Sequence, residues 1–242
     1  MTTPFYVSPQ QVLADKAEYA RKGIARGRSI VICEVLEGIL FIAENPMRTL
    51  HKVSEIYDRI AFAAVGRYNE FEALRVYGIR KADVTGYSYS RHDVTARSLA
   101  GTYAQQLGAT FTHELKPWEV EILIAEVKDK NDPDSVNRLY RVTFDGQISD
   151  ETGIITMGGA AEDLHVKATA HYEKDLSMSE AFCRIVQAMA NHVSRPIKMA
   201  DFEVAMLDFS LERRCFRRFD EAALTEIFGA SQAEPERTGE EE

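Results

Sequence analysis

The strand-like runs of this 242-residue sequence come in adjacent pairs joined by short turns. Residues 29–35 and 39–43 are apolar runs on either side of a turn at Glu37-Gly38. Residues 138–144 lead into Asp145-Gly146, a dipeptide typical of tight hairpin turns. Strands that come in pairs, and do not alternate singly with helices, predict sheets that are mainly antiparallel.

A helix over residues 9–26 is predicted ahead of the first strand pair. Ser8 suits the N-cap and Pro9 the first helical position, while Gln11 could complete a capping box. Apolar residues then recur at spacings of four, three and four, at Leu13, Ala17, Ala20 and Ile24. This stripe is narrow and partly made of alanine, so the helix is expected to lie against a neighbour.

The remaining segments predict further strands and helices around these hairpins. We expect strands at residues 60–66, around 120–124, and at 154–157, 202–209 and 215–219. We expect helices from Asn69, from Asp93, at 161–172, at 178–192 with Ser177 and Glu180 as a capping box, and from Asp220 to 228. No linker rich in Pro, Gly or Ser divides the chain, which predicts one domain over residues 9–229.

Charge and cysteine usage narrow the functional classes. The formal net charge is −9, and a strongly acidic chain argues against a general nucleic-acid binder. Residues 230–242 lack large apolar side chains and are rich in glutamate, which predicts a disordered acidic tail. Cys33, Cys183 and Cys215 are far apart and odd in number, so buried thiols in a reducing compartment are expected. The longest apolar run is only residues 39–43 and no signal peptide precedes it, which predicts a cytoplasmic protein without a membrane partner.

Local motifs give catalysis no support. Gly158-Gly159 lacks the Lys-Ser/Thr of a phosphate loop, and His165 and His171 do not share a helix face as zinc ligands would. No G-x-S-x-G elbow marks a serine nucleophile. We therefore predict no catalytic residue, no metal and no cofactor. Residues 87–91 mix tyrosines with an arginine; a loop between helices with partly buried tyrosines is favoured over a single-strand nucleic-acid platform.

Several segments together resemble the α subunits of 20S proteasomes, of the actinobacterial type. The Ser8-Pro9 helix start before the first strand marks α subunits against β subunits, and residues 20–27, Ala-Arg-Lys-Gly-Ile-Ala-Arg-Gly, look actinobacterial. The resemblance covers most of residues 6–228 and is carried by residues 6–9, 17–27, 29–35, 37–45, 52–58, 63–71, 116–121, 139–146 and 157–159.

The resemblance implies a four-layer αββα sandwich of the N-terminal nucleophile hydrolase type with an added N-terminal helix. It also implies a seven-membered α ring that caps β rings carrying the threonine endopeptidase sites. In that family the nucleophile is an N-terminal Thr whose own amine is the base. Here Arg28-Ser29 occupies its place in mid-chain, so this subunit is expected to be inert.

Two alternatives remain open at this point. One is a catalytic β-type N-terminal threonine hydrolase with a removable propeptide, which a new N-terminal Thr or Ser in the mature chain would support. The other is a free-standing domain that binds small molecules or peptides, which the mass in solution separates from a ring.

The resemblance also implies two functional sites. Residues 1–8 correspond to a pore gate, with Pro4, Phe5 and Tyr6 as its bulky part. Gly27, Lys52 and Gly66 match a pocket that receives the C-terminal tail of an AAA+ ring ATPase or of an ATP-independent activator. The expected partners are thus β subunits, other α subunits, activators and unfolded protein substrates in transit.

Overall fold

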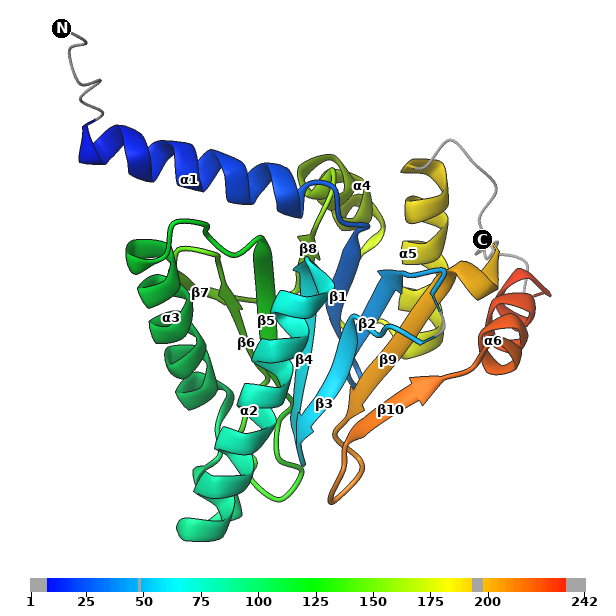
Figure 1. The fold of residues 1–242 in the computed structure, drawn as a ribbon. Helices are drawn as coiled ribbons and strands as arrows, with labels where there is room; N and C mark the ends of the chain where they lie inside the picture. Colours follow the sequence, from blue (N-terminus) through cyan, green and yellow to red (C-terminus); the bar gives the residue numbers. More distant parts are fainter. Residues whose placement is uncertain (1–7, 48, 193–197, 234–242) are drawn as a thin grey trace, which may run out of the picture.

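Two five-stranded antiparallel sheets form the centre of the computed structural model, which describes residues 8–47, 49–192 and 198–233 (Figure 1). One sheet has the order β10-β9-β2-β1-β8. Its strands are β1 (Ile30–Val35), β2 (Gly38–Glu44), β8 (Ile154–Met157), β9 (Phe202–Asp208) and β10 (Phe216–Phe219). The other sheet has the order β3-β4-β5-β6-β7. Its strands are β3 (Val53–Tyr57), β4 (Ile60–Gly66), β5 (Val120–Glu126), β6 (Arg138–Val142) and β7 (Ile148–Glu151). The antiparallel prediction is confirmed.

Helices lie on the outer faces of both sheets and across one end of the sandwich (Figure 1). They are α1 (Pro9–Ile24), α2 (Tyr68–Ser88), α3 (Ala96–His113), α4 (Ala161–His171), α5 (Met178–His192) and α6 (Glu221–Ala233). The α2 and α3 helices pack on the sheet of β4 and β5, whereas α4 and α5 pack on the sheet of β1 and β2. The predicted sandwich of two sheets between helix layers is confirmed.

The apolar side chains form three layers, because successive side chains of a strand point to opposite faces of its sheet. Between the sheets lie alternate residues of β2 and β4, such as Phe41, Ala61 and Ala63. Their neighbours Phe62 and Ala64 face α2 and α3 in an outer layer. Strand β2 is buried along its whole length, because it lies in the middle of its sheet with cover on both faces.

Helix α1 crosses one end of the sandwich and is anchored there (Figure 1). Ser8 Oγ accepts a hydrogen bond from Gln11 N at 3.2 Å, which confirms the predicted N-cap. The Gln11 side chain turns to Asp15 Oδ1 at 2.7 Å, so it does not complete the expected capping box. Lys16 Nζ donates to the Glu114 carbonyl at 2.6 Å and ties α1 to the end of α3. The helix ends at Ile24, two residues before the predicted end at 26.

Three other helix boundaries differ from the predicted ones. Helix α2 begins at Tyr68 after an Arg67 N-cap, so Asn69 is not its cap. Helix α3 begins at Ala96 because Thr95 Oγ1 accepts from Ser98 N at 3.2 Å, while Asp93 lies in a preceding 3₁₀ turn. Helix α6 continues to Ala233, into the first residues of the predicted tail, and residues 234–242 lie outside the described part.

Side chains at the two other predicted caps behave as expected. Ser177 and Glu180 bond reciprocally, since Ser177 N donates to Glu180 Oε2 at 3.1 Å and Glu180 N to Ser177 Oγ at 3.3 Å. Asp220 Oδ1 accepts from Ala223 N at 2.8 Å at the start of α6. Across the three described ranges, no helix is long and apolar enough to span a membrane.

The turn at Asp145-Gly146 joins β6 to β7 and presses against α3. Gly146 has a φ of +85°, and a Cβ there would lie 2.5 Å from the Ala104 carbonyl oxygen and 2.9 Å from Gly108 N. An L-residue is strained at this φ, and backbone atoms cannot move aside easily. Gly146 therefore allows both the hairpin turn and the close packing of this turn against α3.

We predict that Gly146→Ala lowers the free energy of unfolding by about 2 kcal/mol or more, because backbone strain and steric overlap add. Gly101→Ala in α3 is the matched control, since a Cβ there meets no atom within 4 Å. That variant should gain up to about 1 kcal/mol from helix propensity. Urea unfolding of both variants is the measurement, and equal stability of the two would contradict the assignment of the turn.

Candidate functional site

The three residues of the predicted docking pocket, Gly27, Lys52 and Gly66, come together in the structure. Gly27 lies in the turn after α1, Lys52 directly precedes β3, and Gly66 ends β4. A Cβ on Gly27 would lie 3.4 Å from Gly66 N, and Lys52 Nζ donates to the Arg28 carbonyl at 2.7 Å. A lysine amine and two side-chain-free backbone segments thus meet where the α1–β1 connection passes the ends of β3 and β4.

Backbone atoms of other residues lie close to both glycines, Gly27 and Gly66. Gly66 has a φ of +112°, and a Cβ there would overlap the Glu119 carbonyl oxygen. A Cβ on Gly27 would lie 3.0 Å from the Ile24 carbonyl oxygen. The Gly27 carbonyl accepts a hydrogen bond from Gly159 N at 2.8 Å, so the connection is held from its other side as well.

The backbone at Lys52 is fixed by the buried carboxylate of Glu203 in β9. Glu203 Oε2 accepts from Lys52 N at 2.9 Å, and Glu203 Oε1 accepts from Val53 N at 3.2 Å. Asn45 Nδ2 donates to the same carboxylate at 2.8 Å, and Arg218 forms an ion pair with it. Sequence reasoning did not identify Glu203. The one available signal was a carboxylate inside an otherwise apolar strand run.

The Lys52 amine is held in an unusual electrostatic setting. Burial lowers the pKa of Lys52 to about 8, with a further lowering by Arg28, while Glu44 and Glu203 act in the opposite direction. Among the described residues, no carboxylate lies within 4.0 Å of its Nζ, because Arg28 Nη1 takes Glu44 Oε1 at 2.7 Å and Arg218 pairs with Glu203. The amine can therefore donate a hydrogen bond to a carboxylate that comes from outside the chain.

Ser29, at the position of the expected nucleophile, is not arranged for catalysis. It is buried at the start of the first sheet, and its Oγ donates to the Gly159 carbonyl at 2.6 Å. Its nitrogen is part of the peptide bond to Arg28, so no free amine can act as base for the hydroxyl. Within the described ranges, no group of three His, Cys, Asp or Glu side chains could hold a metal ion.

The cysteines are buried free thiols, as predicted. Burial raises the pKa of Cys33 well above its usual range and the pKa of Cys215 to about 11. A thiol that stays protonated is a poor nucleophile. Cys33 and Cys215 are therefore packing groups.

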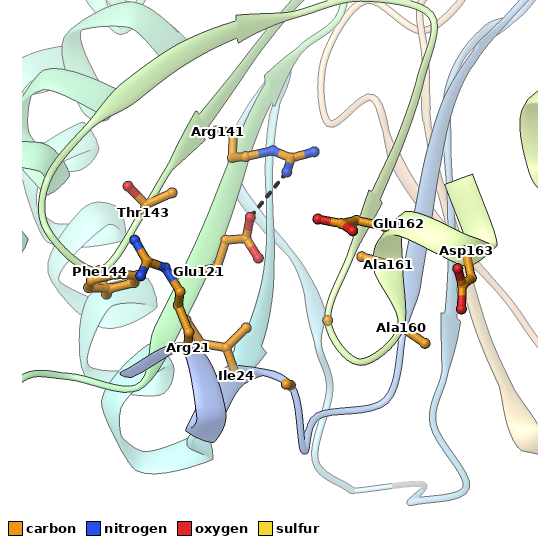
Figure 2. Close-up of a pocket in the computed structure, with 12 residues that line it drawn as sticks. Arg21, Ile24, Glu121, Arg141, Thr143, Phe144, Ala160, Ala161, Glu162 and Asp163 are labelled. Carbon is orange, nitrogen blue, oxygen red and sulfur yellow. Dashed lines mark hydrogen bonds and ion pairs between the residues drawn. The ribbon is translucent and has the colours of Figure 1, made fainter. Parts of the chain in front are cut away.

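A pocket of about 480 Å³ lies beside the C-terminal end of α1, between β5, β6 and the loop before α4 (Figure 2). Figure 2 shows an ion pair between Arg141 and Glu121, from the neighbouring strands β6 and β5, and Arg21 next to Phe144. The ion pair measures 3.3 Å, and the Arg21 guanidinium lies 5.6 Å from the centre of the Phe144 ring. Burial raises the pKa of Glu121. None of the predicted docking residues lines this pocket, and two of its charged groups, Glu121 and Arg141, are engaged with each other.

Two predicted features have other outcomes. Pro4, Phe5 and Tyr6 of the expected gate lie outside the described residues. The partial burial expected for Tyr87 and Tyr89 is wrong, since their exposed fractions are 94% and 81%. Helix α2 continues through Ser88 and its end projects beyond the strands, which leaves these side chains without cover (Figure 1).

The sequence matches known proteins over most of its length. A family model described as "Proteasome subunit" matches residues 26–207. The proteasome subunit alpha of Kineococcus radiotolerans is 50% identical over 239 residues, which cover 96% of this chain and 100% of that protein. That of Thermobifida fusca is 54% identical over 220 residues, 90% of this chain and 87% of that protein. That of Acidothermus cellulolyticus is 52% identical over 232 residues, 94% and 98% respectively.

Two antiparallel sheets between helix layers, an added N-terminal helix and a buried mid-chain serine define a non-catalytic sandwich subunit. The chain belongs to the proteasome subunit family, and it is of the α type found in these actinobacterial relatives.

We predict that Glu203→Ala lowers the free energy of unfolding by about 3–5 kcal/mol, because it leaves the Arg218 charge without its buried partner. Glu203→Gln should cost less, since its amide oxygen can still accept from Lys52 N. Glu18→Ala is the control, because the Glu18–Lys22 pair is exposed and contributes little to stability. Urea unfolding measures the stability, and amide hydrogen exchange at Lys52 and Val53 reports the loop. Unchanged exchange in Glu203→Ala would refute this role.

Proposed function

We propose that this chain forms a seven-membered ring that controls substrate entry into the cytoplasmic 20S proteasome and docks its activators. The names of the relatives support assembly with other proteasome subunits, and the proposed partners are β subunits that carry the threonine endopeptidase sites. The observation that carries the docking role is the convergence of Gly27, Lys52 and Gly66 at one place beside the end of α1. Unfolded proteins are the substrates in transit.

The chemistry of this convergence suits a peptide C-terminus. A carboxylate can accept a charged hydrogen bond from Lys52 Nζ, whose present acceptor is a neutral carbonyl oxygen. The glycines allow the α1–β1 connection and the end of β4 to lie close together beside this amine. Binding of a carboxylate would also favour the charged form of the amine and so raise its pKa. An AAA+ ring ATPase or an ATP-independent activator with an accessible C-terminus would satisfy these contacts.

The gate proposal rests on what precedes α1. Ser8 caps a helix that is anchored across one end of the sandwich, so residues 1–7 continue from a fixed point. Pro4, Phe5 and Tyr6 are bulky, and seven copies of such a segment could close an axial pore.

Lys52→Ala should weaken binding of an activator tail peptide by about 10- to 100-fold, because a hydrogen bond to a charged group is worth about 1.5–3 kcal/mol. Lys52→Arg should restore part of the affinity, since a broad guanidinium replaces a compact ammonium. Wild-type affinity should fall as the pH rises through about 8, where the Lys52 amine loses its proton, whereas Lys52→Arg should bind equally from pH 7 to 9. Fluorescence anisotropy with a labelled tail peptide measures all three.

Lys22→Ala serves as the matched control for this experiment. Lys22 is an exposed lysine on α1 that pairs with Glu18 at 2.6 Å, and its loss should leave the affinity unchanged. Equal affinity of Lys52→Ala and wild type would show that the docking site lies elsewhere.

Deletion of residues 2–7 should raise the turnover of short peptides by the assembled particle several-fold, because entry would no longer be obstructed. This deletion keeps Ser8 and therefore the N-cap of α1. The control is Ser8→Ala in the full-length chain, which costs about 1 kcal/mol of helix stability but leaves the segment in place. Unchanged peptide turnover in a correctly assembled deletion variant would remove the gate from this account.

A further inference from the structure

Two carboxylates act on the charge of the Lys52 amine, and both are bound by arginines. Arg28 Nη1 lies 2.7 Å from Glu44 Oε1, and Arg218 forms an ion pair with Glu203. The amine itself donates to the Arg28 carbonyl oxygen at 2.7 Å. Burial lowers the pKa of Lys52, while Glu44 and Glu203 are the charged groups that raise it. The two negative charges are thus held by arginines, and the lysine bonds to a neutral acceptor.

Consecutive peptide units bring Lys52 and Glu44 to the same place. The Arg28 carbonyl accepts from Lys52 Nζ, and the next carbonyl, that of Ser29, accepts from Glu44 N at 3.0 Å. Glu44 ends β2, opposite the start of β1. The Glu44 side chain therefore starts close to the Lys52 amine, and its carboxylate is an internal competitor for this amine.

The two ion pairs differ in what else the arginine does. Arg218 Nη2 also donates to the Val53 carbonyl at 2.7 Å and so helps to hold the start of β3. The Arg28 side chain has a single ion pair in the described part of the chain, with Glu44. The strands are already joined there by the backbone hydrogen bond between Glu44 and Ser29. The fold therefore does not depend on the Arg28 guanidinium, which is free to serve another purpose.

We propose that Arg28 is a positioning residue for docking: it holds the Glu44 carboxylate and so keeps the Lys52 amine available for the carboxylate of an activator tail. This inference rests on the proposed function. The Glu44 side chain is only 10% exposed, against 45% for Arg28. A buried carboxylate that loses such a cation is destabilised, and pairing with the Lys52 ammonium would recover part of the loss. A tail would then have to displace an internal carboxylate before it could bind.

The test is a double-mutant cycle in the full-length protein, with Arg28→Ala, Glu44→Gln and the two combined. Tail-peptide affinity is measured by fluorescence anisotropy. We expect Arg28→Ala to weaken binding about 3- to 10-fold, because a partly exposed internal ion pair must be broken. Glu44→Gln should strengthen binding by a larger factor in the Arg28→Ala background than in wild type, since only there does Glu44 occupy the Lys52 amine. Arg28→Lys keeps a cation for Glu44 and should retain the affinity of wild type.

Two results would overturn the proposal. Equal factors for Glu44→Gln in both backgrounds would mean that Arg28 acts only through its own charge, because independent effects add. A double variant that binds as weakly as Arg28→Ala would mean that Arg28 contacts the tail directly. A second cycle with Arg28→Met keeps the apolar stem of the side chain, so that lost packing cannot account for the outcome.

Arg217 and Asp208 provide the matched control, since they form an ion pair of similar exposure at 3.0 Å. Asp208 ends β9, at the opposite end of the strand from Glu203. Arg217→Ala removes a positive charge as Arg28→Ala does, and it should leave tail affinity unchanged.

The pKa of Lys52, followed by NMR without any peptide, separates this inference from docking itself. A carboxylate in contact with an amine raises its pKa. Glu44→Gln should therefore lower the pKa of Lys52 more in the Arg28→Ala background than in wild type. An equal lowering in both backgrounds would refute the role of Arg28, whatever the peptide does. No tail binding by wild type would instead defeat the docking function, while a larger lowering in the Arg28→Ala background would still show that Arg28 keeps Glu44 from the amine.

Discussion

The buried carboxylate of Glu203 forms a polar link between the two sheets, whose facing surfaces carry many apolar side chains. It projects from β9 in one sheet and accepts the backbone N–H groups of Lys52 and Val53 at the start of β3 in the other. Arg218 reinforces the same junction, since it pairs with Glu203 and its Nη2 donates to the Val53 carbonyl at 2.7 Å. Apolar packing alone would allow the sheets to slide, because it is not directional. Hydrogen bonds to a fixed carboxylate set the relative position of β3 and β9.

The position of Lys52 follows from this junction, and the position of its neighbours follows from α1. The middle of α1 is tied by Lys16 to the α3 terminus, and the connection after α1 is held by the hydrogen bond from Gly159 N to the Gly27 carbonyl. The Arg28 carbonyl is thereby brought to the Lys52 amine. The candidate site is thus assembled from three parts of the chain that are fixed independently. Neither a mobile loop nor an induced fit is needed to bring them together.

Local chemistry in the sequence was sufficient for much of the fold. Ser8 and Ser177 act through partners three residues away, and Gly146 N donates to the nearby Thr143 carbonyl in its turn, so these local roles could be recognised from spacing. Helix α3 was placed too early because Asp93 and Thr95 are both acceptable caps, and only tertiary contact decides between them. Tyr87 and Tyr89 were expected to be partly covered, but coverage depends on how far α2 reaches beyond the strands.

The candidate site, like the fold, could be predicted only in part from the sequence. Gly27, Lys52 and Gly66 were identified by resemblance, and spacing alone could not have selected them. Glu203 was missed because its partners are separated from it by about 150 positions in sequence. A buried carboxylate acquires its role from those distant donors, which the chain order does not reveal.

The same contacts bear on whether the segment before Ser29 could be a removable propeptide. Ala20 and Ile24 of α1 belong to the apolar layer between the sheets, and both are buried. Removal of the segment would expose that layer and leave Gly159 N without the Gly27 carbonyl. Lys52 Nζ would lose its acceptor as well. A propeptide can be discarded because the mature fold does not depend on it, whereas this segment completes the core and builds half of the candidate site. The helix is therefore an integral part of this fold.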